Sequence, residues 1–585
     1  MSLPLRSAAA LAALSLLAPS ALAGTIFVDA NLTTGANDGS SWANAFQGQD
    51  GLQAALGTAV SGDQVWVAQG SYRPSATGDR LDSFRPINGV EIYGGFQGGE
   101  GSLAERPPIG TAPSVLTADL NGDDGSGGSN AENSTHVIRG AGVNPTAVID
   151  GFTITAGNAN IGSANNNKGG GIICGGGSSP TIRNCRFEGN SCTFGGGAGY
   201  IIAGSVPSFT DCQFIDNNGG SFGGAFDMAG GGAVRYERCL FRGNSAARAG
   251  ALEIFATTGV VVSNCEFYDN TATGSSGGGA LWMGSGGVTT IRNTTIVENH
   301  APVQGIGGIR NQGSTVNVFN SILWNNTGSG GSSSSATQAN STVSISWSLV
   351  QGGFTGAGNV SGDPQFADQA GGDLSLSLTS PAIDAGDNAQ VGAATVDFDG
   401  NPRLADIPSV PDTGSGSAPI VDMGCREAAE SPVTVFCAGD GSGTACPCAN
   451  DGAAGAGCGN GSFAAGSVLS ATGTPSVSND TLTLRAARST PNAPGVFFQG
   501  DDALNGGLGA PFGDGIMCAS NNICRIEVAF ADGAGNASSS ISIAVKCGIT
   551  AGQTARMQWW YRDVALSPCG NQFNVSNGVE TTWAP

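Results

Sequence analysis

The sequence predicts an all-β protein: a right-handed parallel β-helix with a period of about 27 residues, followed by a C-terminal disulfide-rich domain that resembles a β-sandwich. Two observations predict the β-helix. A short phrase with a small residue, then x-Phe-x-x-Asn, occurs four times and is followed by two degenerate copies with Ile296 and Leu323 in place of Phe, and the six copies are evenly spaced. The steps between the small residues are 27, 27, 26, 29 and 27 residues, and those residues are Cys185, Cys212, Cys239, Cys265, Thr294 and Ser321. A fixed period of this size is typical of a solenoid.

Each repeat predicts short strands. The small residue and the residue two positions later point to the same side of a strand, so both face the interior. A second apolar phrase follows about 13 residues later and is entered through glycines, as in Gly196-Gly197-Ala198 and Gly223-Gly224-Ala225. No repeat holds a helical pattern of 10–12 residues, which excludes leucine-rich, ankyrin and TPR architectures. We therefore expect coils of short strands joined at Gly, Asn and Ser corners.

Stacked coils should place equivalent residues in ladders along the axis. We expect Cys185, Cys212, Cys239 and Cys265 to fill the core as free thiols, because later coils use Thr294, Ser321 and Ser348 in the same slot. The amides at the strand ends should bond to one another up a second ladder. Its members are Asn190, Asn217, Asn244, Asn270, Asn299 and Asn326.

The N-terminal part divides into three predicted regions. Residues 1–23 have Arg6, an Ala/Leu-rich stretch and a small-residue ending at Ala23, which predicts a secretory signal peptide. Residues 24–135 are expected to form an N-terminal cap with the early coils, and the helical segment 52–56 should cover the open end of the solenoid. Residues 136–353 are the β-helix repeats, with insertions at 158–168 and 327–341 that should stand off the coils as loops.

The repeat is lost after residue 353. Residues 354–430 are predicted to be a terminal coil or cap segment. Residues 431–585 carry eight cysteines from Cys437 to Cys569, which predicts a disulfide-stapled β domain whose connectivity the sequence leaves open. Alternating apolar residues predict strands there at 482–484 and 541–545.

Composition limits the partners. The formal net charge is −22, so the surface repels nucleic acid and anionic lipid. No stretch of 18 apolar residues follows the signal peptide, so we expect no transmembrane helix. The expected location is secreted, extracellular or on the cell surface, and the expected partner is an extracellular glycan or surface polymer.

Several motifs carry a family resemblance. The opening Phe27-Val-Asp29-Ala-Asn31 and Gly62-Asp63-Gln-Val-Trp66 resemble secreted bacterial right-handed parallel β-helix repeat proteins of the pectin-lyase-like superfamily. Residues 380–424 resemble the choice-of-anchor Q terminus of that group, and the repeats resemble chlamydial polymorphic outer-membrane adhesins. The resemblance implies the fold over roughly residues 25–425, but β-helices serve as enzymes, adhesins and stalks alike. The Asn-Thr-Asp, Gly-His-Gly and Arg-Ile-Lys phrases of pectin hydrolases do not occur here.

One outer column of carboxylates is the best catalytic candidate. Asp216, Asp269 and Glu298 each lie four residues after the ladder position, with Gly243 in the gap. Neighbouring coils would place Asp269 and Glu298 about 5 Å apart. Glycosidases use carboxyl pairs about 5–5.5 or 6.5–9.5 Å apart, so this face could supply either geometry. Acidic turn residues without catalytic function are the alternative.

Other chemistry-bearing residues are fewer. Asp119, Asn121 and Asp123 resemble the start of a calcium loop, although the glycine comes one residue late and no Glu follows at position twelve. The alternative is a polar turn without metal, and no other cofactor is expected. The two histidines, His136 and His300, are far apart in the sequence and do not suggest a catalytic base.

These observations predict an exported, non-enzymatic β-helix scaffold at or outside the cell surface that acts in adhesion or carbohydrate contact. The alternative is a polysaccharide lyase or glycoside hydrolase that acts on the β-helix face. The two differ because an enzyme needs a groove with convergent carboxylates, whereas a scaffold needs only a flat polar face.

Overall fold

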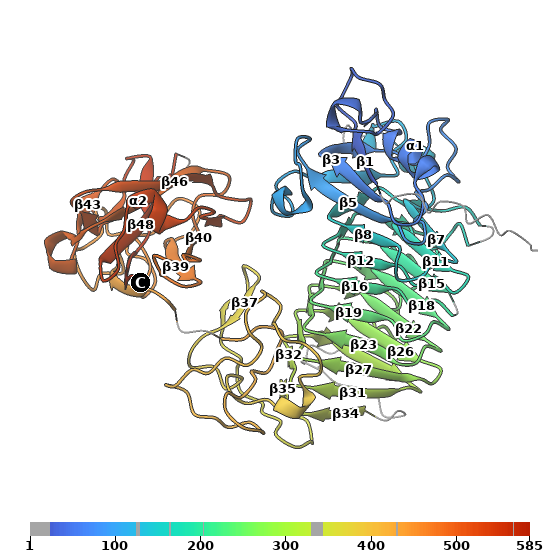
Figure 1. The fold of residues 1–585 in the computed structure, drawn as a ribbon. Helices are drawn as coiled ribbons and strands as arrows, with labels where there is room; N and C mark the ends of the chain where they lie inside the picture. The colour runs from blue at the N-terminus through green and yellow to red at the C-terminus, as the bar shows by residue number, and fades with distance from the viewer. Residues whose placement is uncertain are drawn as a thin grey trace, which may run out of the picture. The chain divides into compact units, whose positions relative to one another are not determined.

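The computed structural model describes residues 24–124, 129–162, 165–202, 204–328, 343–428, 431–564 and 567–585 (Figure 1). The predicted signal peptide and most of the insertion at 327–341 lie outside these ranges. The chain forms two compact units, Met1–Ala428 and Ala429–Pro585. Each is described by itself below.

The first unit is the predicted parallel β-helix. Its strands stack in three long parallel sheets, and one coil contributes a strand to each sheet in turn. The twelve-stranded sheet contains β2 (Phe46–Gln47), β1 (Thr25–Asp29), β3 (Gln64–Ala68), β5 (Glu91–Phe96), β8 (Val148–Asp150), β12 (Thr181–Arg183), β16 (Ser208–Thr210), β19 (Arg235–Glu237), β23 (Val260–Ser263), β27 (Val288–Arg292), β31 (Thr315–Phe319) and β34 (Val343–Ser346).

The ten-stranded sheet contains β4 (Gly70–Tyr72), β6 (Ser114–Thr117), β9 (Phe152–Thr155), β13 (Arg186–Glu188), β17 (Gln213–Ile215), β20 (Leu240–Arg242), β24 (Glu266–Tyr268), β28 (Thr295–Val297), β32 (Ile322–Trp324) and β35 (Leu349–Val350). The seven-stranded sheet contains β7 (Ile138–Ala141), β11 (Ile172–Gly175), β15 (Gly199–Ile202), β18 (Phe226–Ala229), β22 (Leu252–Phe255), β26 (Leu281–Gly284) and β30 (Ile309–Gln312).

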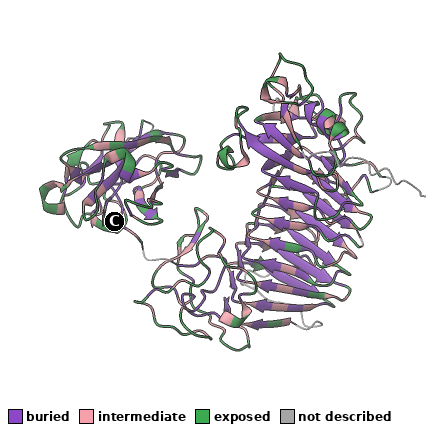
Figure 2. Ribbon diagram, viewed as in Figure 1, coloured by how far each residue is buried: buried purple, intermediate pink, exposed green. Residues whose placement is uncertain are grey.

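Shorter strands follow the ten-stranded sheet in several coils. They are β10 (Asn158–Ala159), β14 (Ser191–Cys192), β21 (Ser245–Ala246), β25 (Thr271–Ala272), β29 (His300–Ala301) and β33 (Thr327–Gly328). Figure 2 shows that the long stacked strands of the first unit consist mostly of buried residues.

The predicted ladders are confirmed. The four ladder cysteines are free and at most 1% exposed. The phenylalanine rings at 187, 214, 241 and 267 stack with centroid separations of 5.3, 4.8 and 4.4 Å. In the Asn ladder, the Nδ2 of each amide from Asn190 to Asn299 donates to the Oδ1 of the next at 2.8–3.1 Å. These amides satisfy one another inside a core that excludes water.

The small ladder residues share one local bond that explains their exchange. Each donates from its Sγ or Oγ to the carbonyl two residues earlier at 2.7–3.4 Å, for Cys185, Cys212, Cys239, Cys265, Thr294, Ser321 and Ser348. The residue before each one turns the corner between two sheets with a φ of 46–54°. A hydroxyl or thiol attached to Cβ can therefore make this bond, which explains why Cys, Thr and Ser exchange at this position.

A helix packs on the N-terminal part of the core. Helix α1 (Gly51–Thr58) buries Leu52, Ala55 and Leu56 against a core that includes Val28 and Val65. The helix thereby shields the apolar interior of the first coils.

Residues 354–428 do more than close the C-terminal end. Phe354 packs on the core, and the chain then passes through β36 (Phe366–Asp368) and β37 (Asp373–Leu376) and lies along the coils. Tyr268 Oη donates to the Gln369 carbonyl at 3.2 Å, and the Cys425 amide donates to Thr295 Oγ1 at 3.0 Å. This segment thus covers part of the face that carries Glu298.

The second unit is built on antiparallel sheets. Its largest sheet contains β38 (Thr434–Cys437), β50 (Gly578–Thr582), β48 (Thr554–Arg562), β41 (Pro494–Gly500), β46 (Cys524–Phe530) and β49 (Phe573–Val575). Smaller sheets contain β39 (Val468–Thr472), β40 (Thr483–Ala487) and β47 (Ala537–Ser538); β42 (Asp502–Ala503) and β45 (Ala519–Ser520); and β43 (Ala510–Phe512) and β44 (Gly515–Met517).

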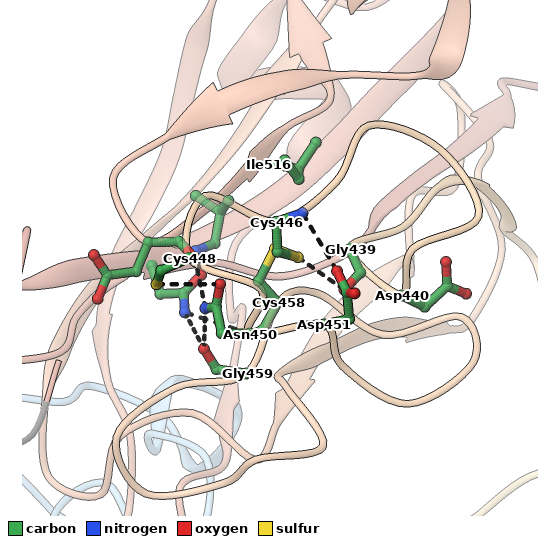
Figure 3. The surroundings of a disulfide bond; sticks show 12 residues. Gly439, Asp440, Cys446, Cys448, Asn450, Asp451, Cys458, Gly459 and Ile516 are labelled. Atoms are coloured by element: carbon green, nitrogen blue, oxygen red, sulfur yellow. Dashed lines mark hydrogen bonds between the residues drawn. A yellow bond between two sulfur atoms is a disulfide. The ribbon is translucent and has the colours of Figure 1, made fainter. Parts of the chain in front are cut away.

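All eight cysteines of this unit are paired, which confirms the predicted disulfide framework. The bridges are Cys437–Cys518, Cys446–Cys458, Cys448–Cys569 and Cys524–Cys547. Figure 3 shows how hydrogen bonds fix the loops around the Cys446–Cys458 bridge: Asn450 Nδ2 donates to the Gly459 carbonyl at 2.7 Å, and the Cys446 amide donates to Asp451 Oδ1 at 3.3 Å.

One predicted strand is wrong. Residues 541–545 do not continue as a strand, because helix α2 (Ile543–Cys547) begins within them. Ser542 caps its N-terminus by accepting from the Val545 amide, and Gly548 ends it with a φ of 64°. A serine and a glycine in these two positions are helix signals that outweigh the apolar alternation.

Candidate functional site

The predicted carboxylate column occupies corners of the coils. Asp216, Asp269 and Glu298 each follow a strand of the ten-stranded sheet and have φ values of 53–57°, and Gly243 takes the same position with a φ of 65°. Short polar residues and glycine are favoured where the backbone is left-handed. This backbone requirement accounts for the Asp and Gly residues in the column.

The three carboxylates have different surroundings. Asp216 is exposed, and Asp269 lies 3.4 Å from Nε2 of His300. Glu298 is half-buried and accepts from Asn325 Nδ2 at 3.2 Å and from Gln369 Nε2. The structure therefore places Asp269 and Glu298 on successive coils but engages each with a different partner.

Two residues of the predicted calcium loop lie in a cluster of carboxylates. Asp119 and Asp123 lie with Asp124 and Glu132, each offering a carboxylate oxygen within 4.8 Å of the others. Asn121 is exposed. Asp119 also accepts from the Gly122 amide at 2.6 Å and from the Asp123 amide at 3.2 Å, so much of its hydrogen-bonding capacity closes its own turn.

The two histidines have separate environments. His136 is fully buried and its Nδ1 lies 2.8 Å from the Gly169 carbonyl. Burial lowers the pKa of His136 to about 4. His300 lies near the surface beside Thr327 and Asp269. Neither arrangement brings the two histidines together.

A row of side chains on the seven-stranded sheet was not predicted from the sequence. Strand pairing sets five outward positions in register, and we call them the carboxylate row: Tyr200, Asp227, Glu253, Trp282 and Arg310. Their neighbours Phe226, Leu252, Leu281 and Ile309 fill the core. The row recurs with the period of the coils, so the residue that follows the inward-facing position of each strand was the available signal.

The two acids of the row are desolvated. Asp227 is 4% exposed and Glu253 is 1% exposed. Burial, followed by the charge of Glu253, raises the pKa of Asp227 to about 8. Burial also raises the pKa of Glu253, against the opposing effect of its ion pair with Arg248. A carboxyl that stays protonated near neutral pH can donate a proton.

Two cations cover these acids and stack on aromatic rings. Lys168 Nζ lies 4.9 Å from the ring centroid of Phe194 and 4.4 Å from that of Tyr200. Arg248 Cζ lies 4.2 Å from the ring centroid of Phe222 and 4.1 Å from that of Trp282. These cation–π contacts close the row against solvent.

The second unit contains an open cavity of about 610 Å³, which we call the aromatic groove. It is lined by Val496, Phe498, Phe512, Met517, Ile523, Arg525, Trp560, Arg562 and Phe573. Adjacent rings lie close together: Phe512 and Phe573 have centroids 5.0 Å apart, and Trp560 and Phe573 5.8 Å. The Arg562 guanidinium lies 5.3 Å from the Trp560 ring.

Strand alternation positions the groove. Phe497, Trp559 and Tyr561 are fully buried in the core on one side of the sheet. Their neighbours Val496, Phe498 and Trp560 therefore point to the other side, where Val496 and Trp560 are paired in register. A free face of an antiparallel sheet is usually polar, so an aromatic one indicates a binding surface.

Comparisons with known proteins agree with the fold of the first unit. Residues 127–267 and 170–346 match a family model described as a right handed beta helix region. This span contains the coils from β7 to β34. No curated protein matches the sequence.

Two of the solved structures to which the chain is similar are an enzyme and a phage tailspike domain. The crystal structure of pectate lyase Pel9A is 13% identical, covers 70% of this chain and 97% of its own, and gives a TM-score of 0.36. The enzymatically active domain of tailspike protein 2 from bacteriophage CBA120 is 10% identical, covers 90% and 73%, and gives a TM-score of 0.25. Within the described residues, no helix is long and apolar enough to span a membrane.

Proposed function

We propose that this chain is an exported, non-enzymatic β-helix scaffold whose aromatic groove binds an extracellular glycan that carries carboxylate groups. Four disulfides support export, because such bridges form and persist in oxidising compartments. The observation that carries glycan binding is the groove itself, in which aromatic rings and two arginines share one cavity.

The chemistry of the groove matches a sugar acid. Flat rings offer apolar contact to the faces of sugar rings, and the polar groups at the edge of such a site orient the ligand. Arg525 and Arg562 present guanidinium groups, which bind carboxylates through paired hydrogen bonds. In a chain with a net charge of −22, two arginines in one cavity make a local site for an anion.

The predicted carboxylate column is consistent with a scaffold. Asp216, Asp269 and Glu298 serve corners of left-handed backbone, which is a structural use of these positions. Substitution Asp269→Asn should therefore leave glycan binding and any glycan turnover unchanged, as measured side by side with the wild type.

Binding should be tested on the full chain with polygalacturonate as the acidic probe and a neutral glucan as the comparison. We expect the wild type to bind polygalacturonate, and Trp560→Ala to weaken this binding about tenfold or more, because truncating a central aromatic anchor typically costs about 2 kcal/mol. The double variant Arg525→Gln/Arg562→Gln should remove the preference for the acidic polymer.

Two matched controls lie outside the groove. Val545 is 82% exposed on α2 and Arg485 is exposed on β40. Val545→Ala and Arg485→Gln should bind like the wild type. Equal losses in groove and control variants, or wild-type protein that binds neither polymer, would refute the proposed groove.

A second candidate function, a glycan-cleaving enzyme on the β-helix face, is favoured by one observation. Asp227 and Glu253 lie on adjacent coils, about 5 Å apart along the sheet, and Asp227 has its pKa raised to about 8. Retaining glycosidases use such a pair, with one acid protonated. The cover of Lys168 and Arg248 argues against it, since the substrate must reach both carboxyls.

Release of reducing ends separates the two functions. The scaffold function predicts no release from either polymer by the wild type. Release that disappears in Asp227→Asn, and persists in Asp269→Asn, would establish the enzyme in its place.

A further inference from the structure

Three stretches of the segment 354–428 meet in one buried polar network. They are 380–386, 397–403 and 421–424. The Asp384 amide donates to Asp422 Oδ1 at 2.7 Å. Arg403, 1% exposed, donates to the carbonyls of Asp422 and Gly424 at 3.1 and 2.6 Å and lies 3.3 Å from Glu427. These contacts hold the three stretches of the segment together.

The Asp384 carboxylate is left out of this network. Asp384 is 0% exposed, and neither Oδ1 nor Oδ2 has a hydrogen-bond partner. Burying an unpaired carboxylate is very costly, because the charge loses its hydration and gains nothing in return. A buried carboxylate in this state requires a cation or a proton.

Two further carboxylates converge on it. Asp406 and Asp412 each place an oxygen within 4.8 Å of an Asp384 oxygen. The loop that carries them is fixed in place, since the amides of Thr413 and Gly414 both donate to the Asp384 carbonyl at 2.9 Å. Three like charges this close repel one another unless a positive charge lies between them.

We propose that Asp384, Asp406 and Asp412 bind a Ca²⁺ ion. All three ligands are carboxylate oxygens, which hard divalent cations prefer. They come from a turn and a loop, and Ca²⁺ accepts such irregular geometry more readily than Mg²⁺, which demands a near-ideal octahedron. Backbone carbonyls and water complete the coordination of Ca²⁺ in sites of this kind. The ion would tie the loop 406–412 to the turn at 384, and this site is independent of the aromatic groove.

Substitution Asp384→Asn gives the sharpest test. Asp384 has a φ of 50°, and Asn tolerates this backbone as well as Asp does, so the variant keeps shape and conformation while it loses the charge. The full chain should be stripped with EGTA, and thermal unfolding of its first unit measured with and without 2 mM Ca²⁺, a concentration of about the order that extracellular calcium modules bind.

We expect Ca²⁺ to reverse the order of thermal stability of the wild type and Asp384→Asn. In EGTA, Asp384→Asn should unfold at the same temperature as the wild type or higher, because it removes an unpaired buried charge. In Ca²⁺ the wild type should rise by about 3 °C or more, and the variant should not. A wild type that does not respond to Ca²⁺, or a variant that responds equally, would overturn the proposal.

Calorimetric titration with Ca²⁺ provides a second variant and a control. Asp406 and Asp412 are exposed, so Asp406→Asn/Asp412→Asn should fold normally and weaken one Ca²⁺-binding event about tenfold or more. Asp119→Asn/Asp123→Asn should retain that event, and Mg²⁺ should replace Ca²⁺ poorly. Identical titrations of the wild type and Asp406→Asn/Asp412→Asn would exclude the site.

Discussion

At the residue scale, a buried histidine ties the stability of the β-helix to pH. His136 is fully enclosed, and burial, reinforced by the nearby charge of Arg139, lowers its pKa to about 4. An unfolded histidine titrates near 6.5. The folded protein therefore holds this side chain neutral where the unfolded chain is protonated, and the histidine has a structural function.

The sign of the pH dependence follows from these two pKa values. The stabilising contribution of neutral His136 is complete above pH 6.5 and is lost as pH falls toward 4. The loss amounts to about 3 kcal/mol over this range. We expect His136→Asn to abolish this part of the pH dependence in denaturant unfolding at pH 7, 5.5 and 4. The difference between the two proteins isolates the histidine from the many carboxylates, and parallel curves would contradict the assignment.

At the element scale, the Asn ladder links successive coils of the β-helix through side-chain hydrogen bonds. Each amide from Asn190 to Asn299 donates to the next amide and also to a main-chain carbonyl, as when Asn244 Nδ2 donates to the Phe214 carbonyl at 2.8 Å. The ladder lies in the dry interior, where each unpaired group costs its full desolvation energy. A column of identical side chains thereby supports the same corner in every coil.

Breaking one rung should destabilise the first unit. Asn244→Ala removes the acceptor of the Asn217 amide and side chain, at 3.1 and 3.0 Å, and the donor to Asn270. We expect a loss of about 3 kcal/mol or more in the free energy of unfolding, measured by the denaturant midpoint. Asn218→Ala is the control, because the exposed Asn218 side chain accepts from the Gly220 amide alone at 2.9 Å and should cost less than about 1 kcal/mol. Equal losses of stability in Asn244→Ala and Asn218→Ala would show that the ladder adds no stability.

At the scale of the whole molecule, the fold followed from the period, whereas the candidate sites did not. Spacing predicted the coils because every turn needs the same small residue and the same Asn. The carboxylate row repeats in position but not in residue type, running from Tyr200 through Asp227 and Glu253, so no motif marked it. The aromatic groove joins strands that are distant in the chain, such as β41 and β48, and their pairing order cannot be read from a sequence.

The two units should respond differently to reduction. All four disulfides lie within 437–569, and every free cysteine of the chain lies in the first unit. Calorimetry should show two transitions, and a reducing agent should remove or strongly lower only one, because loss of a native disulfide from a small domain typically costs 2–5 kcal/mol. The oxidised protein in the same buffer is the reference. A shift of both transitions would contradict independent unfolding.

The buried free thiols make the order of folding and oxidation important. Seven cysteines remain unpaired and buried in the same chain that forms four bridges. A thiol in a closed coil cannot reach an oxidant, and burial raises the pKa of Cys174 to about 12, which suppresses the reactive thiolate. Before the coils close, the same thiols are open to any oxidant that forms the bridges. The native set of disulfides therefore forms only if the coils close before their thiols are oxidised. The rate of folding thus determines which cysteines pair.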